Sequence, residues 1–219
     1  MAAKADYRDI VAHYEACLAE HGDTHLGVDW PNPEDARKRY KVMLDLVGRE
    51  AARAGPTLLD FGCGASHLYE YMVAEGWDGV RYVGLDLSSD FVDLSRSKFP
   101  DNDYVCGDVL AEPELLPDFD YAVMNGVFTE KRGMSHEDMF AYFERLVALV
   151  WERARAGIAF NLMSKQVDWE RDDLFHVSYD ALAAFLTAQL TRKYVIRNDY
   201  GLYEYTVYVL KEGVQWPGS

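Results

Sequence analysis

After Pro56 the sequence changes from a helical pattern to short apolar runs that alternate with helical segments. The first of these runs, residues 57–61, leads into the turn Gly62-Cys63-Gly64 and then into a helical segment. Continuous apolar runs of this length are typical of strands buried on both faces, and strands that alternate with helices form a parallel sheet with helices on both faces. This alternation predicts an α/β fold.

Seven strands are expected, and the last two differ from the rest. Residues 194–198 and 203–211 alternate apolar and polar side chains on either side of Gly201, which predicts an antiparallel pair. The expected fold is therefore a Rossmann-like, seven-stranded and mostly parallel sheet with helices on both faces and an antiparallel terminal strand. The strands are expected at residues 57–61, 81–87, 104–106, 119–124, 157–162, 194–198 and 203–211.

Helical spacing of apolar side chains marks the segments between the strands and a region before them. Asn32 and Pro33 suit the start of a helix, which the pattern extends to Ala51. The sequence thus divides into an N-terminal helical extension, residues 1–55, and an α/β domain, residues 56–219. The other helices are expected at residues 7–20, 66–74, 89–98, 135–150 and 178–190.

Charge and cysteine content exclude several classes of protein. The 219 residues carry 22 basic and 37 acidic side chains, a net charge of −15, and such a surface repels nucleic acid and anionic membranes. Cys17, Cys63 and Cys106 are odd in number and lack a CxxC spacing, which indicates a reducing compartment without disulfides or structural zinc. Residues 1–6 lack the apolar segment of a secretory signal, and no run is long enough to span a membrane. The expected location is the cytoplasm.

The ends of the first two strands carry acidic residues. Asp60 comes just before Gly62-Cys63-Gly64, where two glycines let the backbone turn tightly and let a ligand approach main-chain N–H groups. Asp86 ends the second strand, 22 residues after Gly64. In nucleotide-binding α/β folds an acid about 20 residues after the glycine turn accepts hydrogen bonds from ribose hydroxyls. These two strand ends predict a crevice that binds a nucleoside.

The third and fourth strands end in polar residues that are expected beside the same crevice. Asp108, followed by Val109, comes after the third strand and can accept a hydrogen bond from an adenine amino group. Asn125 ends the fourth strand, which the switch-point topology places next to the first strand and opposite the glycine turn. Four polar strand ends are thus expected around one ligand.

In this order the strand ends resemble the class I S-adenosylmethionine-dependent methyltransferases, in particular small bacterial ones, over roughly residues 57–211. The resemblance implies S-adenosylmethionine as the cofactor. Ser66 stands where the family commonly has a third glycine. The residues implied to bind the cofactor are Asp60, Gly62, Cys63 and Gly64 for the methionine part, Asp86 for the ribose, Leu87, Asp108 and Val109 for the adenine, and the backbone of Asn125 for the amino group.

The N-terminal extension is expected to cover the crevice, as in the small bacterial methyltransferases that the sequence resembles. Trp30 is expected to pack on the ligand, and Arg39 to pair with its carboxylate.

A nicotinamide dinucleotide is the competing ligand. Its fingerprint needs a third glycine three residues after the second, and His67 occupies that position. Asp60 would also repel a pyrophosphate, whereas nearby carboxylates stabilise a cationic sulfonium. The sequence therefore favours a methyltransferase over an NAD-dependent oxidoreductase.

The expected reaction moves a methyl group to an oxygen or a nitrogen of a small molecule. Asn125 and Asn161 stand where metal-dependent catechol methylation would need acidic residues, so no metal is expected. The fourth strand also lacks the prolines of enzymes that methylate bases in nucleic acid. A hydroxyl or protonated amine needs a base. The candidate bases are His67, His136, His176, Asp199 and Tyr200.

A catalytically silent cofactor-binding module or partner subunit is the alternative from a different class. The acids Asp60, Asp86 and Asp108 argue against it, because a site that has lost its reaction has no reason to keep all three.

Overall fold

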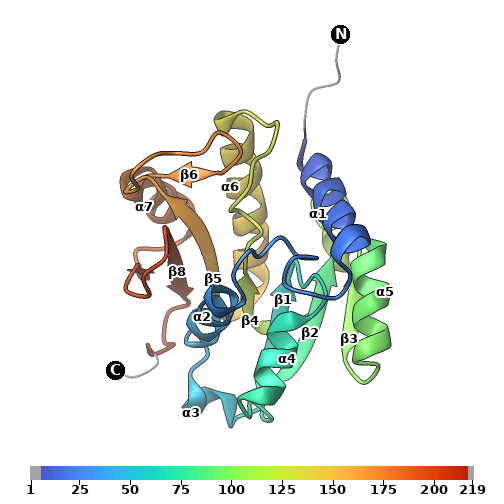
Figure 1. Cartoon of the computed structure of the whole chain (residues 1–219). Helices are drawn as coiled ribbons and strands as arrows, with labels where there is room; N and C mark the ends of the chain where they lie inside the picture. The colour runs from blue at the N-terminus through green and yellow to red at the C-terminus, as the bar shows by residue number, and fades with distance from the viewer. Residues whose placement is uncertain (1–5, 217–219) are drawn as a thin grey trace.

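The computed structural model describes residues 6–216 and is built on one mostly parallel sheet (Figure 1). The strands lie in the order β3-β2-β1-β4-β5-β8-β7. A further strand of two residues, β6 (His176–Val177), pairs with the end of β5. The expected fold class is confirmed. The seven main strands are β1 (Thr57–Phe61), β2 (Arg81–Asp86), β3 (Asp103–Cys106), β4 (Phe119–Met124), β5 (Ala154–Ser164), β7 (Tyr194–Arg197) and β8 (Glu204–Leu210).

The order of the strands reverses at β1. This strand pairs in parallel with β2 on one side and with β4 on the other. The last strand, β8, runs antiparallel between β5 and β7, as the alternating pattern around Gly201 predicts. Because β1 to β4 are parallel, their carboxyl ends lie at one edge of the sheet, and the reversal opens a crevice there.

Helices cover both faces of the sheet because alternate residues of each strand point to opposite faces. Leu59 belongs to a core cluster with residues of α1, α6 and α7, whereas Leu58 belongs to a second cluster with residues of α2 and α4. The helices are α1 (Tyr7–His21), α2 (Pro33–Leu44), α3 (Arg49–Ala52), α4 (His67–Ala74), α5 (Ser89–Lys98), α6 (His136–Arg153) and α7 (Tyr179–Phe185), which continues as a π-helical turn (Leu186–Leu190).

The single helix expected from Pro33 to Ala51 is wrong in length. It ends at Leu44, and the short helix α3 begins only at Arg49. Gly48 lies between them with a φ of 70°, which glycine adopts readily and an α-helix does not contain. Apolar spacing alone could not reveal this break, because the apolar residues beyond Gly48 keep the helical period.

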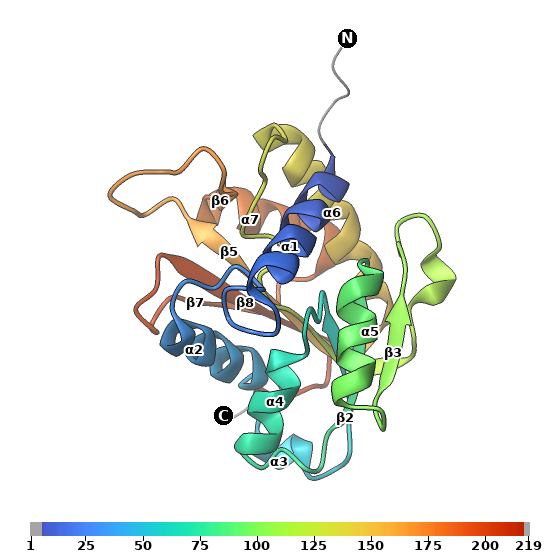
Figure 2. The same cartoon turned by 45° about the vertical axis from the view of Figure 1, so that its right-hand side comes forward.

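Helix α1 lies beside α5, close to the carboxyl ends of the parallel strands (Figures 1 and 2). Its contacts with the ends of the strands include two short hydrogen bonds: the Ser88 hydroxyl donates to Glu15 (2.6 Å), and the Tyr7 hydroxyl donates to Asp108 (2.6 Å). Among residues 6–216 no helix combines the length and apolarity needed to cross a bilayer. The expectation that residues 1–6 carry no secretory signal falls largely on residues 1–5, which lie outside the described residues.

Candidate active site

A cavity opens at the carboxyl ends of β1 to β4, and α1 with the loop at residues 22–31 forms its opposite wall. We call the strand-end residues of this cavity the rim, and α1 with residues 22–31 the cover. Ten of the eleven residues predicted to bind the cofactor line the cavity, and Arg39 is the exception. The ten are Trp30, Asp60, Gly62, Cys63, Gly64, Asp86, Leu87, Asp108, Val109 and Asn125. Their role in binding stays a prediction.

The glycine turn follows β1 and depends on both of its glycines. Gly62 has a φ of 73° and Gly64 a φ of 51°, a region that other residues rarely enter. A Cβ at Gly62 would also lie 2.7 Å from Val127 Cγ2. The N–H of Gly62 donates to Leu85 (2.7 Å), which fixes the turn against β2. The turn therefore brings main-chain atoms to the cavity wall that a larger residue would block.

Asp86 connects the ends of β1 and β2. Its Oδ2 accepts from the N–H of Gly64 (2.8 Å), and its Oδ1 accepts from the N–H of Ser88 (3.0 Å). Burial raises the pKa of this carboxyl, and the two backbone donors act in the opposite direction. Each oxygen keeps a lone pair for a further donor. The carboxylate is thus held in place by the backbone while it still faces the cavity.

Asp60 is the more deeply buried carboxyl, with 3% of its surface exposed. Its pKa is raised to about 7: burial is the largest cause, the neighbouring Asp86 also raises the pKa, and the hydrogen bond from the Tyr82 hydroxyl (2.8 Å) lowers it. The rim therefore holds a carboxyl that gains or loses its proton near neutral pH.

The third rim carboxyl meets the cover directly. Asp108 accepts from the N–H of Leu110 (3.0 Å) and from the hydroxyl of Tyr7 in α1. The Tyr7 ring is stacked on Tyr142 of α6 with centroids 4.8 Å apart, and Arg8 lies 3.5 Å from the same carboxylate. The first turn of α1 thus closes over the end of β3.

The end of β4 carries an unpaired polar atom. The Oδ1 of Asn125 is buried and has no hydrogen-bond partner. The next residue, Gly126, donates its N–H to Oδ1 of Asn161 (2.8 Å) on β5. Trp30 packs so closely on Gly126 that a Cβ there would lie 2.9 Å from Cζ2 of the indole. Asn125 thus lines the cavity while its Oδ1 stays buried behind the wall without a donor.

Arg39 is placed differently from the expectation that it pairs with a ligand carboxylate. Its Nε and Nη2 bind the buried carboxylate of Glu204 on β8 at 2.7 to 2.9 Å, and its guanidinium lies 4.2 Å from the Trp30 ring centroid. Glu204 in turn accepts from Asn161 (3.0 Å). Because Glu204 holds the guanidinium, Arg39 supports Trp30 from outside the cavity.

Of the five candidate bases, only His67 lines the cavity. Its Nε2 lies 2.8 Å from Asp23 of the cover. The other four are engaged elsewhere. His136 Nε2 contacts the backbone oxygen of His176 (2.9 Å), His176 Nδ1 contacts that of Ser164 (2.6 Å), Asp199 pairs with Arg197 (3.0 Å), and the Tyr200 hydroxyl lies 3.0 Å from Thr206.

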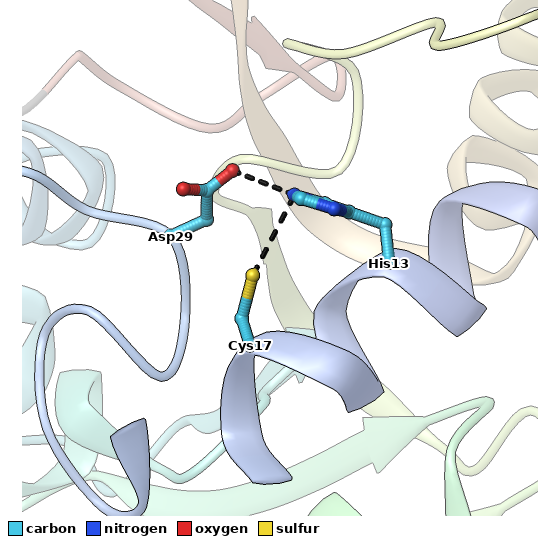
Figure 3. Close-up of side chains that lie close together, drawn as sticks. All are labelled: His13, Cys17 and Asp29. Atoms are coloured by element: carbon cyan, nitrogen blue, oxygen red, sulfur yellow. Dashed lines mark hydrogen bonds and ion pairs between the residues drawn. The ribbon is translucent and has the colours of Figure 1, made fainter. Parts of the chain in front are cut away.

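Several residues around the cavity were missed by sequence reasoning. Tyr7 and Tyr142 line it, although the apolar spacing of Tyr7 indicated only helix packing and nothing in the sequence marked Tyr142. Beside the cavity a polar cluster joins the cover to the loop after β4. It consists of His13, Cys17, Asp29, Glu130 and Arg132, and Figure 3 shows the first three. The spacing of His13 and Cys17, one helical turn apart, was the one local signal for it.

Comparison with known proteins agrees with this arrangement. Residues 59–156 match the family described as "Methyltransferase domain". Rv1506c, a candidate methyltransferase of Mycobacterium tuberculosis, is 27% identical over 157 residues, which are 69% of this chain and 91% of the relative.

Solved structures show the same fold. Magnesium protoporphyrin IX methyltransferase of Synechocystis, with bound S-adenosylmethionine, gives a TM-score of 0.65 at 14% identity and covers 96% of this chain and 100% of its own. A plantazolicin methyltransferase with S-adenosylhomocysteine and a desmethyl analogue gives 0.63 at 10% identity, with coverage of 94% and 99%.

The fold and the matching domain define a methyltransferase. Residues 59–156 carry this domain, and the resemblance to the class I S-adenosylmethionine-dependent methyltransferases drawn from the strand ends is confirmed.

Proposed function

We propose that this chain transfers a methyl group from S-adenosylmethionine to an oxygen or nitrogen of a small, neutral or cationic molecule. The observation that carries the proposal is the meeting of three carboxyls, Asp60, Asp86 and Asp108, at one cavity that α1 closes.

The residues of the cavity fit the cofactor that the family uses. The backbone of Asn125, which lines the cavity, would meet the amino group of the cofactor. Asp86 has lone pairs free for two ribose hydroxyls, and Asp108 can accept from an adenine amino group. Asp60 places negative charge where a cationic ligand would lie. We assign the remaining wall of the adenine site to Leu87 and Val109, which line the cavity beside these acids.

The cofactor supplies an electrophilic methyl group that a nucleophile displaces in line with the sulfonium sulfur. The chain itself contributes alignment and exclusion of water, and proximity alone can supply about 7–11 kcal/mol of the barrier. His67 is the proposed base, because it lies in the cavity wall and contacts Asp23, which would orient its ring and stabilise its protonated form. It would take the proton that a hydroxyl loses as it is methylated, or the proton that an ammonium must lose before its nitrogen can attack.

The charges of the cavity support a neutral or cationic acceptor. The charged side chains among its described lining residues are the three aspartates, and no lysine or arginine joins them. Much of the remaining wall is aromatic or aliphatic, with Trp30 and Tyr14 from the cover and Val127 after β4. Such a wall binds an apolar body and disfavours a phosphate or carboxylate. An acceptor with an apolar frame and one hydroxyl or amine fits best.

Calorimetric titration with S-adenosylmethionine, S-adenosylhomocysteine and NADH tests the cofactor. We expect both sulfur compounds to bind at one site per chain and NADH not to bind. Binding of NADH alone would overturn the proposal.

Mass spectrometry of small-molecule pools incubated with a labelled methyl donor tests the transfer. We expect label in neutral or amine-bearing compounds. Cofactor binding without label in any fraction would instead favour the silent module. His67→Ala, compared with His21→Ala on the exposed end of α1, tests the base through the pH profile of turnover.

A further inference from the structure

Four side chains of the kinds that ligate metals converge where the cover meets the loop after β4, and Figure 3 shows three of them, His13, Cys17 and Asp29. His13 and Cys17 lie one turn apart on α1, Asp29 belongs to the loop of the cover, and Glu130 follows β4. The Nε2 of His13 lies 2.8 Å from Asp29 Oδ2, 3.6 Å from Cys17 Sγ and 3.9 Å from Glu130 Oε2. Imidazole, thiol and carboxyl atoms from three separate segments thus surround one small volume.

We propose that His13, Cys17 and Asp29 bind a divalent transition cation of the Zn²⁺ type, with the Glu130 carboxylate as the fourth ligand. Zinc binds nitrogen at about 2.0–2.1 Å and sulfur at about 2.3 Å, so a tetrahedral ion would separate the two atoms by about 3.5 Å. The observed separation of 3.6 Å fits this geometry. The Asp29 oxygen would have to move about half an ångström away from Nε2. A set with thiolate and imidazole favours Zn²⁺ or Co²⁺ over Mg²⁺ and Ca²⁺.

The charges of the cluster point to the same ligand. Without a metal, the carboxyls of Asp29 and Glu130 interact with two guanidinium groups, that of Arg132, which lies 3.1 Å from Glu130, and that of Arg171. The two carboxyls are close enough to hydrogen-bond to each other, and the Glu130 side chain is only 11% exposed. A divalent cation would offset the repulsion between two carboxylates held this close.

Arg132 determines how the protons move when an ion binds. Its Nη2 lies 2.7 Å from His13 Nδ1. A guanidinium only donates, so Nδ1 accepts and the imidazole proton lies on Nε2, facing Asp29. For Nε2 to ligate an ion, this proton has to move to Nδ1 and Arg132 has to leave that contact. The Cys17 thiol proton goes to solvent. Binding is therefore expected to release at least one proton per ion.

An ion at this point would join α1 and the loop of the cover to the loop that follows β4. It would fasten the cover over the rim by bonds much stronger than the hydrogen bonds present without it. Binding of the ion is tested on the full chain without cofactor or acceptor, so its outcome is independent of the proposed methyl transfer.

Cobalt titration of chelator-treated protein is the first test. We expect one Co²⁺ per chain, a thiolate-to-cobalt charge-transfer band, displacement by Zn²⁺ and no displacement by Mg²⁺. Cys17→Ser should abolish the band, whereas Cys106→Ser, at the exposed free cysteine, should leave it unchanged. His13→Ala should weaken Zn²⁺ by more than the ~10–100-fold that loss of an outer-shell partner costs, and His21→Ala should not weaken it. Absence of the band, or its persistence in Cys17→Ser, overturns the site.

Alkylation of the unaltered chain is the second test and does not depend on the folding of any variant. Zn²⁺ should slow the modification of Cys17, read by peptide mass spectrometry, and leave that of Cys106 unchanged. Equal modification of Cys17 with and without Zn²⁺ would contradict the proposal. In that case the cluster acts only through its hydrogen bonds and ion pairs.

Discussion

The rim and the cover form opposite walls of one cavity, but they are held in place by different kinds of interaction. The rim acids are fixed by donors close to the strands: Asp86 by the N–H of Gly64 and of Ser88, and Asp60 by Tyr82 on the adjacent strand. The cover is held by side chains far apart in sequence, such as Tyr7 with Asp108. The rim is therefore a property of the sheet itself, whereas the cover is attached to it.

This difference indicates which wall opens. The contacts of the cover include exposed or half-buried hydrogen bonds and ion pairs, and each contributes about 0.5–1.5 kcal/mol or less. Lifting α1 would break several of them and leave every strand pairing of the sheet intact. The rim cannot move without loss of the hydrogen bonds between β1 and β2. A ligand is thus expected to enter from the side of α1.

The largest effect is expected from a change in the rim. Asp86→Asn replaces a carboxylate that organises two backbone N–H groups and faces the proposed ribose site. It should weaken the binding of S-adenosylhomocysteine by about 1.5–3 kcal/mol, the scale of a hydrogen bond to a charged group. Calorimetry measures this loss of affinity, and Asp90→Asn at an exposed position of α5 is the matched control. Equal affinities in the two variants would remove Asp86 from the site.

The next effect tests the contact between the two walls. A methyl group at Gly126 would lie 2.9 Å from the Trp30 ring, whereas one at Gly201 would meet no atom within 4 Å. Both glycines have positive φ, 83° and 74°, so the backbone strain of alanine is similar. Gly126→Ala should therefore be destabilised by about 1–3 kcal/mol more than Gly201→Ala, the usual range for overpacking. Urea unfolding of both variants gives the difference in the free energy of unfolding. Equal stabilities would show that the Trp30 side chain moves aside without a loss of stability.

The same contrast explains which parts of the molecule could be predicted from the sequence. The rim could be predicted because its signals are local: an apolar run, a glycine turn and an acid at each strand end. Gly62, Gly64 and Asp86 needed no knowledge of the rest of the chain. The place of β4 beside β1 was expected from the switch-point topology, and the antiparallel terminal strand from the alternating pattern around Gly201.

The cover could not be predicted in the same way, because its side chains find partners across the fold. Arg39 was expected at a ligand, but Glu204, 165 residues later, holds it. His176 was a candidate base, but a two-residue strand buries it against the backbone of Ser164. The cluster around His13 needed Asp29 and Glu130, which no spacing in the sequence connects. The environment of a single charged or aromatic side chain depends on tertiary packing.

Asp60 of the rim should make both the stability of the fold and the affinity for a cationic ligand depend on pH. Burial raises its pKa from an ordinary value of 3.8 to about 7, so the folded protein holds this proton more tightly than the unfolded chain does. The free energy of unfolding should therefore fall as pH rises from about 4 to 7 and lose no more from this group above 7. A cationic ligand prefers the ionised carboxyl, so its affinity should rise through the same range.

We expect the affinity for S-adenosylmethionine to rise by up to about tenfold per pH unit below 7 and to level off above it. Calorimetry at several pH values measures this, and Asp60→Asn should remove the dependence. A dependence that persists in Asp60→Asn would assign it to another group of the cavity wall, such as Asp86, whose pKa burial also raises.

The smallest effect is expected in the cover. Lys98 bridges Asp23 of the cover loop, at 2.8 Å, to Glu70 of α4, and His67 contacts the same Asp23 oxygen. Asp23→Asn weakens this attachment but leaves every rim contact in place. An ion pair of this exposure contributes at most about 1 kcal/mol, so global stability should hardly change.

If the cover is the wall that opens, loss of the Asp23 ion pair should accelerate dissociation of S-adenosylhomocysteine about two- to fivefold, with a smaller change in the association rate. Stopped-flow measurement of both rates separates the two, and Asp35→Asn, which loosens the Lys38 pair on the exposed side of α2, is the control. Unchanged dissociation in Asp23→Asn would mean that the loop at residues 22–31 stays closed and that α1 alone controls access.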